Sequence, residues 1–148
     1  MTAAAFDFHR FRPLKDIMDT SRFTSSPLLP LAARVLLAVL FLLSGLGKLA
    51  APGPTQGYIA SMGLPFPLMA YCVAVLIEVG GSLLLIAGYR TRFVALVLAV
   101  FSIVTAAVFH HMLADQNQMI HFFKNIAIAG GLLQVAAFGA GRISFDRC

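Results

Sequence analysis

Four long apolar stretches are the feature that most constrains the fold of this chain. They cover about residues 31–51, 67–88, 93–113 and 119–139. Each is close to the ~20 residues that an α-helix needs to cross a hydrocarbon layer about 30 Å thick. Because lipid offers the backbone no hydrogen-bond partners, spanning segments are helices or closed barrels, and these runs are continuous where barrel strands would alternate. The sequence therefore predicts an all-α, membrane-embedded four-helix bundle.

The composition agrees with a membrane protein and excludes two other classes. Of the 148 residues, 59% are hydrophobic and 11% are charged, whereas an average soluble domain has about 25% charged residues. A water-soluble domain of this length cannot hide so much apolar surface, and so apolar a chain is not disordered as a whole. The formal charge of +5 does not indicate nucleic-acid binding, because most basic residues lie near the N-terminus and at segment ends. The bilayer is the predicted partner.

The basic residues predict the orientation of the bundle. They precede the first apolar stretch or lie near its start, fill the connection over residues 89–92 and follow the fourth stretch: Arg10, Arg12, Lys15, Arg22, Arg34, Arg90, Arg92, Arg142 and Arg147. The connection over residues 114–118 carries Asp115 as its one charged residue. Because basic loops stay on the cytoplasmic side, we expect both termini to be cytoplasmic.

The chain divides into two predicted parts. Residues 1–27 form a polar segment that we expect in the cytoplasm, and residues 28–148 form the four-helix transmembrane domain. Inside that domain, the prolines and glycines of residues 52–66 predict a loop that breaks the chain between the first two helices.

Charged and polar residues occur inside the predicted spans, where they are expensive. A charged side chain at a helix centre costs about 2.5–3.5 kcal/mol on insertion scales, so each one needs a partner or a purpose. Glu78 lies well inside the second stretch, Lys48 near the end of the first, His110 near the end of the third, and Lys124 with Asn125 a few residues into the fourth. All of them fall in the half of the bilayer that we expect to face outward. We therefore predict one shared polar site there.

Two interpretations of this site remain open at the level of sequence. Glu78 can form a structural ion pair with Lys48 or Lys124 that fixes the register of the bundle. Alternatively, two lysines against one glutamate leave an excess positive charge, which suits a quinone carbonyl or a small oxyanion. In that mechanism Glu78 exchanges protons with the ligand, the lysines stabilise negative charge on its oxygens, and His110 relays protons outward. A metal site is not expected, because the histidines lack ligand spacing and the lysines repel a cation.

Short motifs in a fixed order resemble the DoxX family of small bacterial four-helix membrane proteins. The motifs are Arg34-Val-Leu-Leu-Ala, Phe41-Leu-Leu-Ser-Gly-Leu-Gly-Lys48, Gly63-Leu-Pro, Glu78-Val-Gly-Gly, Tyr89-Arg-Thr-Arg92, His110, Phe123-Lys-Asn125, Gly130-Gly-Leu-Leu133 and Gly141-Arg-Ile-Ser-Phe-Asp146. The resemblance covers about residues 31–146 and implies a multi-pass protein of the bacterial inner membrane. By position, Arg34, Lys48, Glu78, Lys124 and Asn125 match motif positions of the family. We expect Arg34, Lys48, Lys124 and Asn125 to bind a ligand beside Glu78.

The resemblance further implies an association with redox chemistry, since the family takes its name from subunits linked to a thiosulfate:quinone oxidoreductase. Cys72 and Cys148 are the two cysteines of the chain, and they form no C-x-x-C motif. We therefore expect a membrane subunit that binds a quinone-like or small anionic ligand and receives electrons from a soluble or membrane redox partner. The alternatives are a non-catalytic scaffold that recruits partner proteins, and a small transporter in which a homodimer would supply eight spans.

Overall fold

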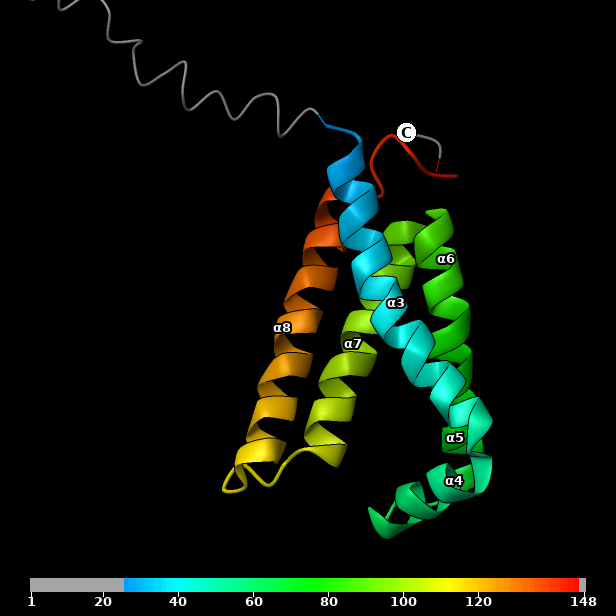
Figure 1. Cartoon of the computed structure of the whole chain (residues 1–148), viewed down its shortest axis with the longest axis vertical. Helices are drawn as coiled ribbons and strands as arrows, with labels where there is room; N and C mark the ends of the chain where they lie inside the picture. Colours follow the sequence, from blue (N-terminus) through cyan, green and yellow to red (C-terminus); the bar gives the residue numbers. More distant parts are fainter. Residues whose placement is uncertain (1–25, 147–148) are drawn as a thin grey trace, which may run out of the picture.

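The structure is a computed structural model that describes residues 26–146 of the chain, and its helices carry the labels of Figure 1. The elements are α3 (Leu28–Ala50), α4 (Pro52–Ser61), α5 (Pro67–Val75), η2 (Leu76–Gly80), α6 (Gly81–Ala87), α7 (Thr91–Phe109) and α8 (Gln116–Phe138). Residues 26–146 contain helices and no strand. Apart from its last two residues, the predicted cytoplasmic segment 1–27 lies outside the described residues.

The predicted all-α fold with four spans is confirmed. Three of the four candidate spans are single helices, namely α3, α7 and α8. The second span is the continuous helix Pro67–Ala87, which α5, η2 and α6 form together. The third span ends at Phe109 rather than near residue 113. The fourth begins at Gln116, because the Asp115 side chain accepts a hydrogen bond from the Gln118 N–H and caps the helix.

The prediction of a helix-free break over residues 52–66 is wrong for most of that region, because Pro52–Ser61 forms α4. Pro52 and Pro54 lie in the first turn of α4. The first turn of a helix has no intrahelical acceptors for its N–H groups, so a residue without an N–H loses nothing there. Both prolines, which suggested a break, are therefore compatible with the start of a helix.

The spans are arranged as two pairs. Helices α7 and α8 lie side by side and antiparallel, while α3 packs against the helix made of α5, η2 and α6. In Figure 1 the two pairs lie close together near the start of α3 and the C-terminal segment, and they spread apart towards α4 and the α7–α8 connection. We call the first of these the terminal end and the second the loop end.

Packing between α3 and η2 depends on a small residue at the point of contact. A Cβ added to Gly45 would lie 2.6 Å from Val79 Cγ2 and 3.1 Å from Glu78 Cβ. Glycine at this position therefore lets the two helices approach closely, as small residues do in membrane bundles. Nearer the terminal end the core is apolar and includes Leu85, Leu98 and Leu132. Large apolar residues on the outer surface, such as Leu36 and Leu43, suit contact with lipid.

Candidate functional site

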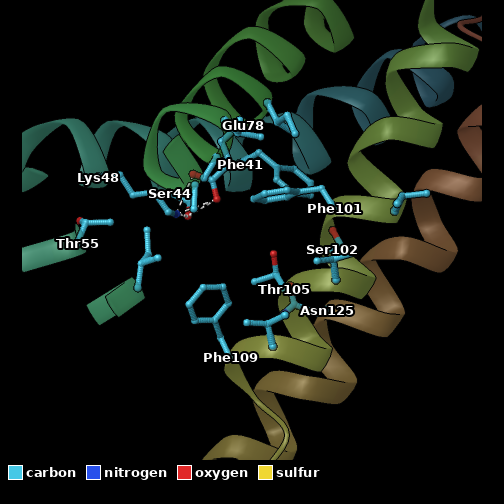
Figure 2. Close-up of a pocket in the computed structure, with 18 of the residues that line it drawn as sticks. Phe41, Ser44, Lys48, Thr55, Glu78, Phe101, Ser102, Thr105, Phe109 and Asn125 are labelled. Atoms are coloured by element: carbon cyan, nitrogen blue, oxygen red, sulfur yellow. Dashed lines mark hydrogen bonds and ion pairs between the residues drawn. The ribbon is translucent and has the colours of Figure 1, made fainter. Parts of the chain in front are cut away.

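An ion pair joins α3 to η2 in the loop-end half of the bundle. Lys48 Nζ lies 2.8 Å from each of the two carboxylate oxygens of Glu78. Ser44 Oγ donates to Glu78 Oε1 at 3.1 Å and accepts from Lys48 Nζ at 2.9 Å. The Glu78 side chain is 5% exposed and the Lys48 side chain 25%. We call Ser44, Lys48 and Glu78 the cavity cluster, shown in Figure 2.

The local backbone explains why these three side chains meet. Ser44 and Lys48 are four residues apart on α3, so they lie on the same face of that helix. Glu78 lies in the π-helical turn η2, and its carbonyl accepts a hydrogen bond from the Ser82 hydroxyl. Tyr71 OH donates to the Lys48 carbonyl at 3.3 Å near the end of α3. Single π turns often occur at functional sites, and no pattern in the sequence indicated this one.

The cavity cluster faces a cavity of about 1020 Å³. Apolar side chains from α3, α5 and α7 form most of its wall, among them Phe41, Val73, Val100 and Phe101. A large, mainly apolar space with a few polar groups is typical of small-molecule sites, and this volume lies at the top of their range of about 300–1000 Å³. The arrangement suits a lipophilic molecule with a polar head.

Polar groups from α7 and α8 lie on the opposite wall, as Figure 2 shows for Thr105 and Asn125. Asn125 Nδ2 donates to the His121 carbonyl at 3.0 Å, which orients its side chain. His110 also lines the cavity, and its Nδ1 lies 2.8 Å from Gln118 Oε1. The His110 ring stacks on His121 with 5.1 Å between ring centroids. Residues of all four spans therefore line this cavity, and of the predicted site residues Lys48, Glu78, His110 and Asn125 are among them.

Helix α4 borders the loop end of the cavity, a contribution that sequence reasoning missed. Thr55, Tyr58 and Ile59 of α4 line the cavity. Tyr58 stacks on Phe109 of α7 with 5.6 Å between ring centroids, and Ile59 is buried. These contacts connect α4 to the end of α7 across the space between the two helix pairs. The spacing of apolar residues in this short helix is too weak to have indicated a role.

Lys124 does not join the site. It is exposed and does not line the cavity, whereas its neighbour Asn125 does. Consecutive residues of an α-helix point about 100° apart, so one position can face the cavity and the next the surroundings. The prediction of an excess positive charge is therefore wrong, because one lysine and one glutamate line the cavity and their charges balance.

Arg34 also lies apart from the cavity, at the terminal end. It precedes Lys48 by fourteen residues on the same helix, which separates them by about 21 Å along the axis. The guanidinium is 1% exposed and donates to the carbonyls of Leu85, Ile86 and Ile143. The structure thus gives Arg34 backbone partners in a buried position, away from the predicted ligand site.

The C-terminal segment, residues 139–146, completes this second polar cluster. The N–H groups of Phe145 and Asp146 donate to the carbonyls of Ala87 and Gly88. The Asp146 carboxylate accepts from the Arg90 N–H at 2.6 Å and from the Thr91 N–H at 2.8 Å. We call Arg34 and Asp146, with these backbone partners, the terminal clamp.

Asp146 has a lowered pKa in this setting. Burial raises the pKa of its carboxyl, but hydrogen bonds from Thr91 and Arg90 and the positive charge of Arg34 outweigh that effect. The carboxylate is therefore stabilised in its ionised form, as the clamp requires.

The comparisons with known proteins place the chain among bacterial membrane proteins. The DoxX family model matches residues 29–111. The inner membrane protein YphA of Escherichia coli K12 is 36% identical over 139 residues, which cover 88% of this chain and 99% of YphA. The inner membrane protein YqjF of the same organism is 38% identical over 117 residues, covering 79% of this chain and 88% of YqjF. No solved structure matches the chain significantly. With four spans, a matching family model and these relatives, the chain is a multi-pass inner-membrane protein and belongs to the DoxX family.

Proposed function

We propose that this protein binds a quinone-like molecule in the large cavity and acts as the membrane subunit of an oxidoreductase system. The observation that carries the proposal is an apolar cavity of about 1020 Å³ with one buried ion pair on its wall. Balanced charges favour a neutral ligand head over a small anion, because a free anion gains little from a site without excess positive charge. A neutral ring with carbonyl or hydroxyl oxygens and an apolar tail suits both parts of the wall.

The hydrogen bonds of Glu78 leave room for such a ligand. The carboxylate accepts two bonds from Lys48 and one from Ser44, while two carboxylate oxygens offer about four acceptor positions. A ligand hydroxyl can donate to the remaining position, and Glu78 can accept its proton. The Lys48 ammonium group, beside both carboxylate oxygens, then stabilises negative charge on the ligand oxygen. Thr105 and Asn125 line the opposite wall of the cavity, where they would contact the far side of the ligand ring.

Electron transfer in this proposal needs a second protein. The cysteines Cys72 and Cys148 are far apart in the sequence, and the chain carries no C-x-x-C motif. We therefore assign the electron exchange to a redox partner protein and the ligand site to this chain. A quinol bound here gives its two electrons to an oxidised partner and its protons to Glu78 and the aqueous side, and the reverse holds for a reduced partner.

A non-catalytic scaffold is the second candidate, and one observation favours it. Lys48 already directs hydrogen bonds to both oxygens of Glu78 and to Ser44, so its three N–H donors have partners without any ligand. In that case the ion pair serves only to connect α3 to η2, and the cavity is filled by lipid.

A charge-exchanged variant separates the two candidates. The probe is a short-chain benzoquinone with an isoprenoid tail, titrated into the detergent-solubilised full chain. We expect Glu78→Lys combined with Lys48→Glu to fold, because an ion pair is nearly symmetric to exchange, yet to bind the probe at least about tenfold more weakly than the unchanged protein. The exposed Lys124→Gln variant is the control and should bind normally. Equal binding by the exchanged variant, or no binding by the unchanged protein, would support the scaffold.

The orientation of the bundle is part of the same proposal. We propose that the terminal end faces the cytoplasm, because Arg90, Arg92 and Arg142 lie there, while the α7–α8 connection carries Asp115. A cysteine introduced at Gln116 in a cysteine-free background should react with an impermeant thiol reagent in intact spheroplasts. Labelling only after the membrane is opened would reverse the orientation and place the cavity in the inner half.

A further inference from the structure

A second cavity lies at the terminal end, between the start of α7 and the end of α8. Its volume is about 640 Å³, and it is separate from the large cavity near Glu78. Three arginines contribute to its wall: Arg90 and Arg92 at the start of α7, and Arg142 in the C-terminal segment. The function proposed above makes no use of it.

The charge of this second cavity is positive. The three arginines are exposed, and none forms an ion pair within residues 26–146. Asp146, the acidic residue of the wall, is already engaged by the N–H groups of Arg90 and Thr91. Three arginines and one carboxylate thus line the cavity, and because the carboxylate already accepts main-chain hydrogen bonds, an anion would find guanidinium donors there without displacing an existing bond.

The arginines converge because residues far apart in the sequence meet at this end. The segment after α8 turns back at Gly139 and runs beside the α6–α7 connection, where Asp146 N donates to the Gly88 carbonyl. A Cβ built on Gly139 would lie 3.5 Å from Arg92 Nε, so the Arg92 side chain crosses the end of α8. Arg142 is brought to the same place by that turn. The site is therefore a product of the docked C-terminal segment.

Large aromatic side chains line the cavity beside the arginines. Phe93, in the first turn of α7, is 65% exposed, and Phe138, the last residue of α8, is 81% exposed. Both also belong to the cavity wall. A soluble phosphate compound would leave these rings without a partner, whereas a lipid brings a phosphate and acyl chains together. Arginines beside exposed aromatic rings are typical of the level where head groups meet hydrocarbon.

We propose that this cavity binds the phosphate of an anionic phospholipid, with the acyl chains along Phe93 and Phe138. Guanidinium groups bind phosphate oxygens with two parallel hydrogen bonds, which favours arginine over lysine in such a site. Basic pockets between transmembrane helices bind anionic lipid head groups in general. Three arginines suit a lipid with two phosphates best, so cardiolipin should bind more tightly than phosphatidylglycerol, and both more tightly than phosphatidylethanolamine.

Native mass spectrometry of the delipidated full chain, titrated with each of these three lipids, tests the proposal. We expect Arg92→Gln and Arg142→Gln each to weaken cardiolipin binding about fivefold, the effect of one basic residue near a membrane surface. The matched control is Lys124→Gln, which removes an exposed charge at the other end of α8 and should leave binding unchanged. Arg92→Lys should retain more affinity than Arg92→Gln, which separates loss of charge from loss of folding.

Two results would overturn the proposal. One is equal retention of cardiolipin by the unchanged protein and by the variant that carries both glutamine substitutions, provided that both remain monodisperse. The other is displacement of cardiolipin by millimolar inorganic phosphate or glycerol phosphate, which would show that the arginines take a soluble phosphate and that the aromatic rings are not involved. An order of affinities for the three lipids that does not follow their charge would also overturn the proposal.

Discussion

The two polar clusters of this bundle differ in the partners of their charged groups. In the terminal clamp, Arg34 donates to main-chain carbonyls and Asp146 accepts from main-chain N–H groups. In the cavity cluster, Lys48 and Glu78 bind each other and Ser44 through side chains alone. The clamp is buried around Arg34, whereas the cavity cluster borders a space of about 1020 Å³.

This difference shows how the role of a buried charge in a membrane protein can be inferred from its bonding partners. A charge bonded to main-chain atoms holds segments of the chain in place, and those partners cannot move without unfolding. A side-chain pair beside a cavity can rearrange, because rotamers change more easily than the backbone. Both Arg34 and Glu78 matched motif positions in the sequence, yet Arg34 bonds to main-chain carbonyls, whereas Glu78 borders the cavity in which we propose that a ligand binds.

The largest expected effect is on the clamp. Arg34→Met should lower the free energy of unfolding in detergent by about 3–5 kcal/mol, because the carbonyls of Leu85, Ile86 and Ile143 each lose a hydrogen bond from a buried charged donor. Lys124→Met, which removes an exposed cation, should change it by less than about 0.5 kcal/mol. The fraction of Arg34→Met that remains folded should bind the benzoquinone probe normally. Weak probe binding by Arg34→Met with unchanged stability would contradict this distinction between the two clusters, since it would make Arg34 part of the ligand site.

A smaller effect is expected where α3 contacts η2 behind the cavity cluster. Gly45→Ala adds a Cβ 2.6 Å from Val79 Cγ2, and we expect the overpacking to cost about 1–3 kcal/mol and to weaken probe binding by displacing Glu78. Gly47→Ala is the matched control, because a Cβ there meets nothing within 4 Å. It should stabilise the helix by up to about 1 kcal/mol. Equal thermal stability of the two variants would contradict the close approach of these helices.

The smallest effect concerns the pH dependence of the clamp. Because the pKa of Asp146 is lowered in the folded protein, its contribution to stability is fully present above the unfolded value of about 3.9 and is lost as the pH falls through the lower folded value. Asp146→Asn should remove that part of the acid sensitivity and lower the melting temperature at neutral pH. Melting curves in detergent between pH 7 and pH 3 provide the measurement. Identical slopes for the two proteins would show that Asp146 is not held by the clamp.

Much of the fold was predictable from sequence because a bilayer imposes a local rule. Hydropathy and length identify each span without knowledge of the others. A charged side chain inside a span costs free energy whichever side of the helix it occupies, so Glu78 is recognisable from sequence as a residue that needs a partner. Helical spacing also predicts an inward-facing stripe on the second span, made of Tyr71, Ala74, Glu78, Gly81, Ser82 and Leu85. Four of these six residues are buried, and Ala74 and Gly81 are partly exposed. The family resemblance adds the order of these pieces, and the comparisons confirm the family.

The details of the site depend on how the helices rotate and pair, which no local pattern encodes. Lys48 rather than Lys124 meets Glu78 because Asn125, one position further along α8, faces the cavity instead. The partners of Arg34 lie on α6 and the C-terminal segment, distant in sequence. The π turn at Glu78 and the contact of α4 with the end of α7 were likewise not indicated by any local pattern. The sequence by itself determined four spans and the polar residues that need partners, since burial in lipid is a property of each segment. The tertiary structure alone decided which partners they find, since that depends on geometry between segments.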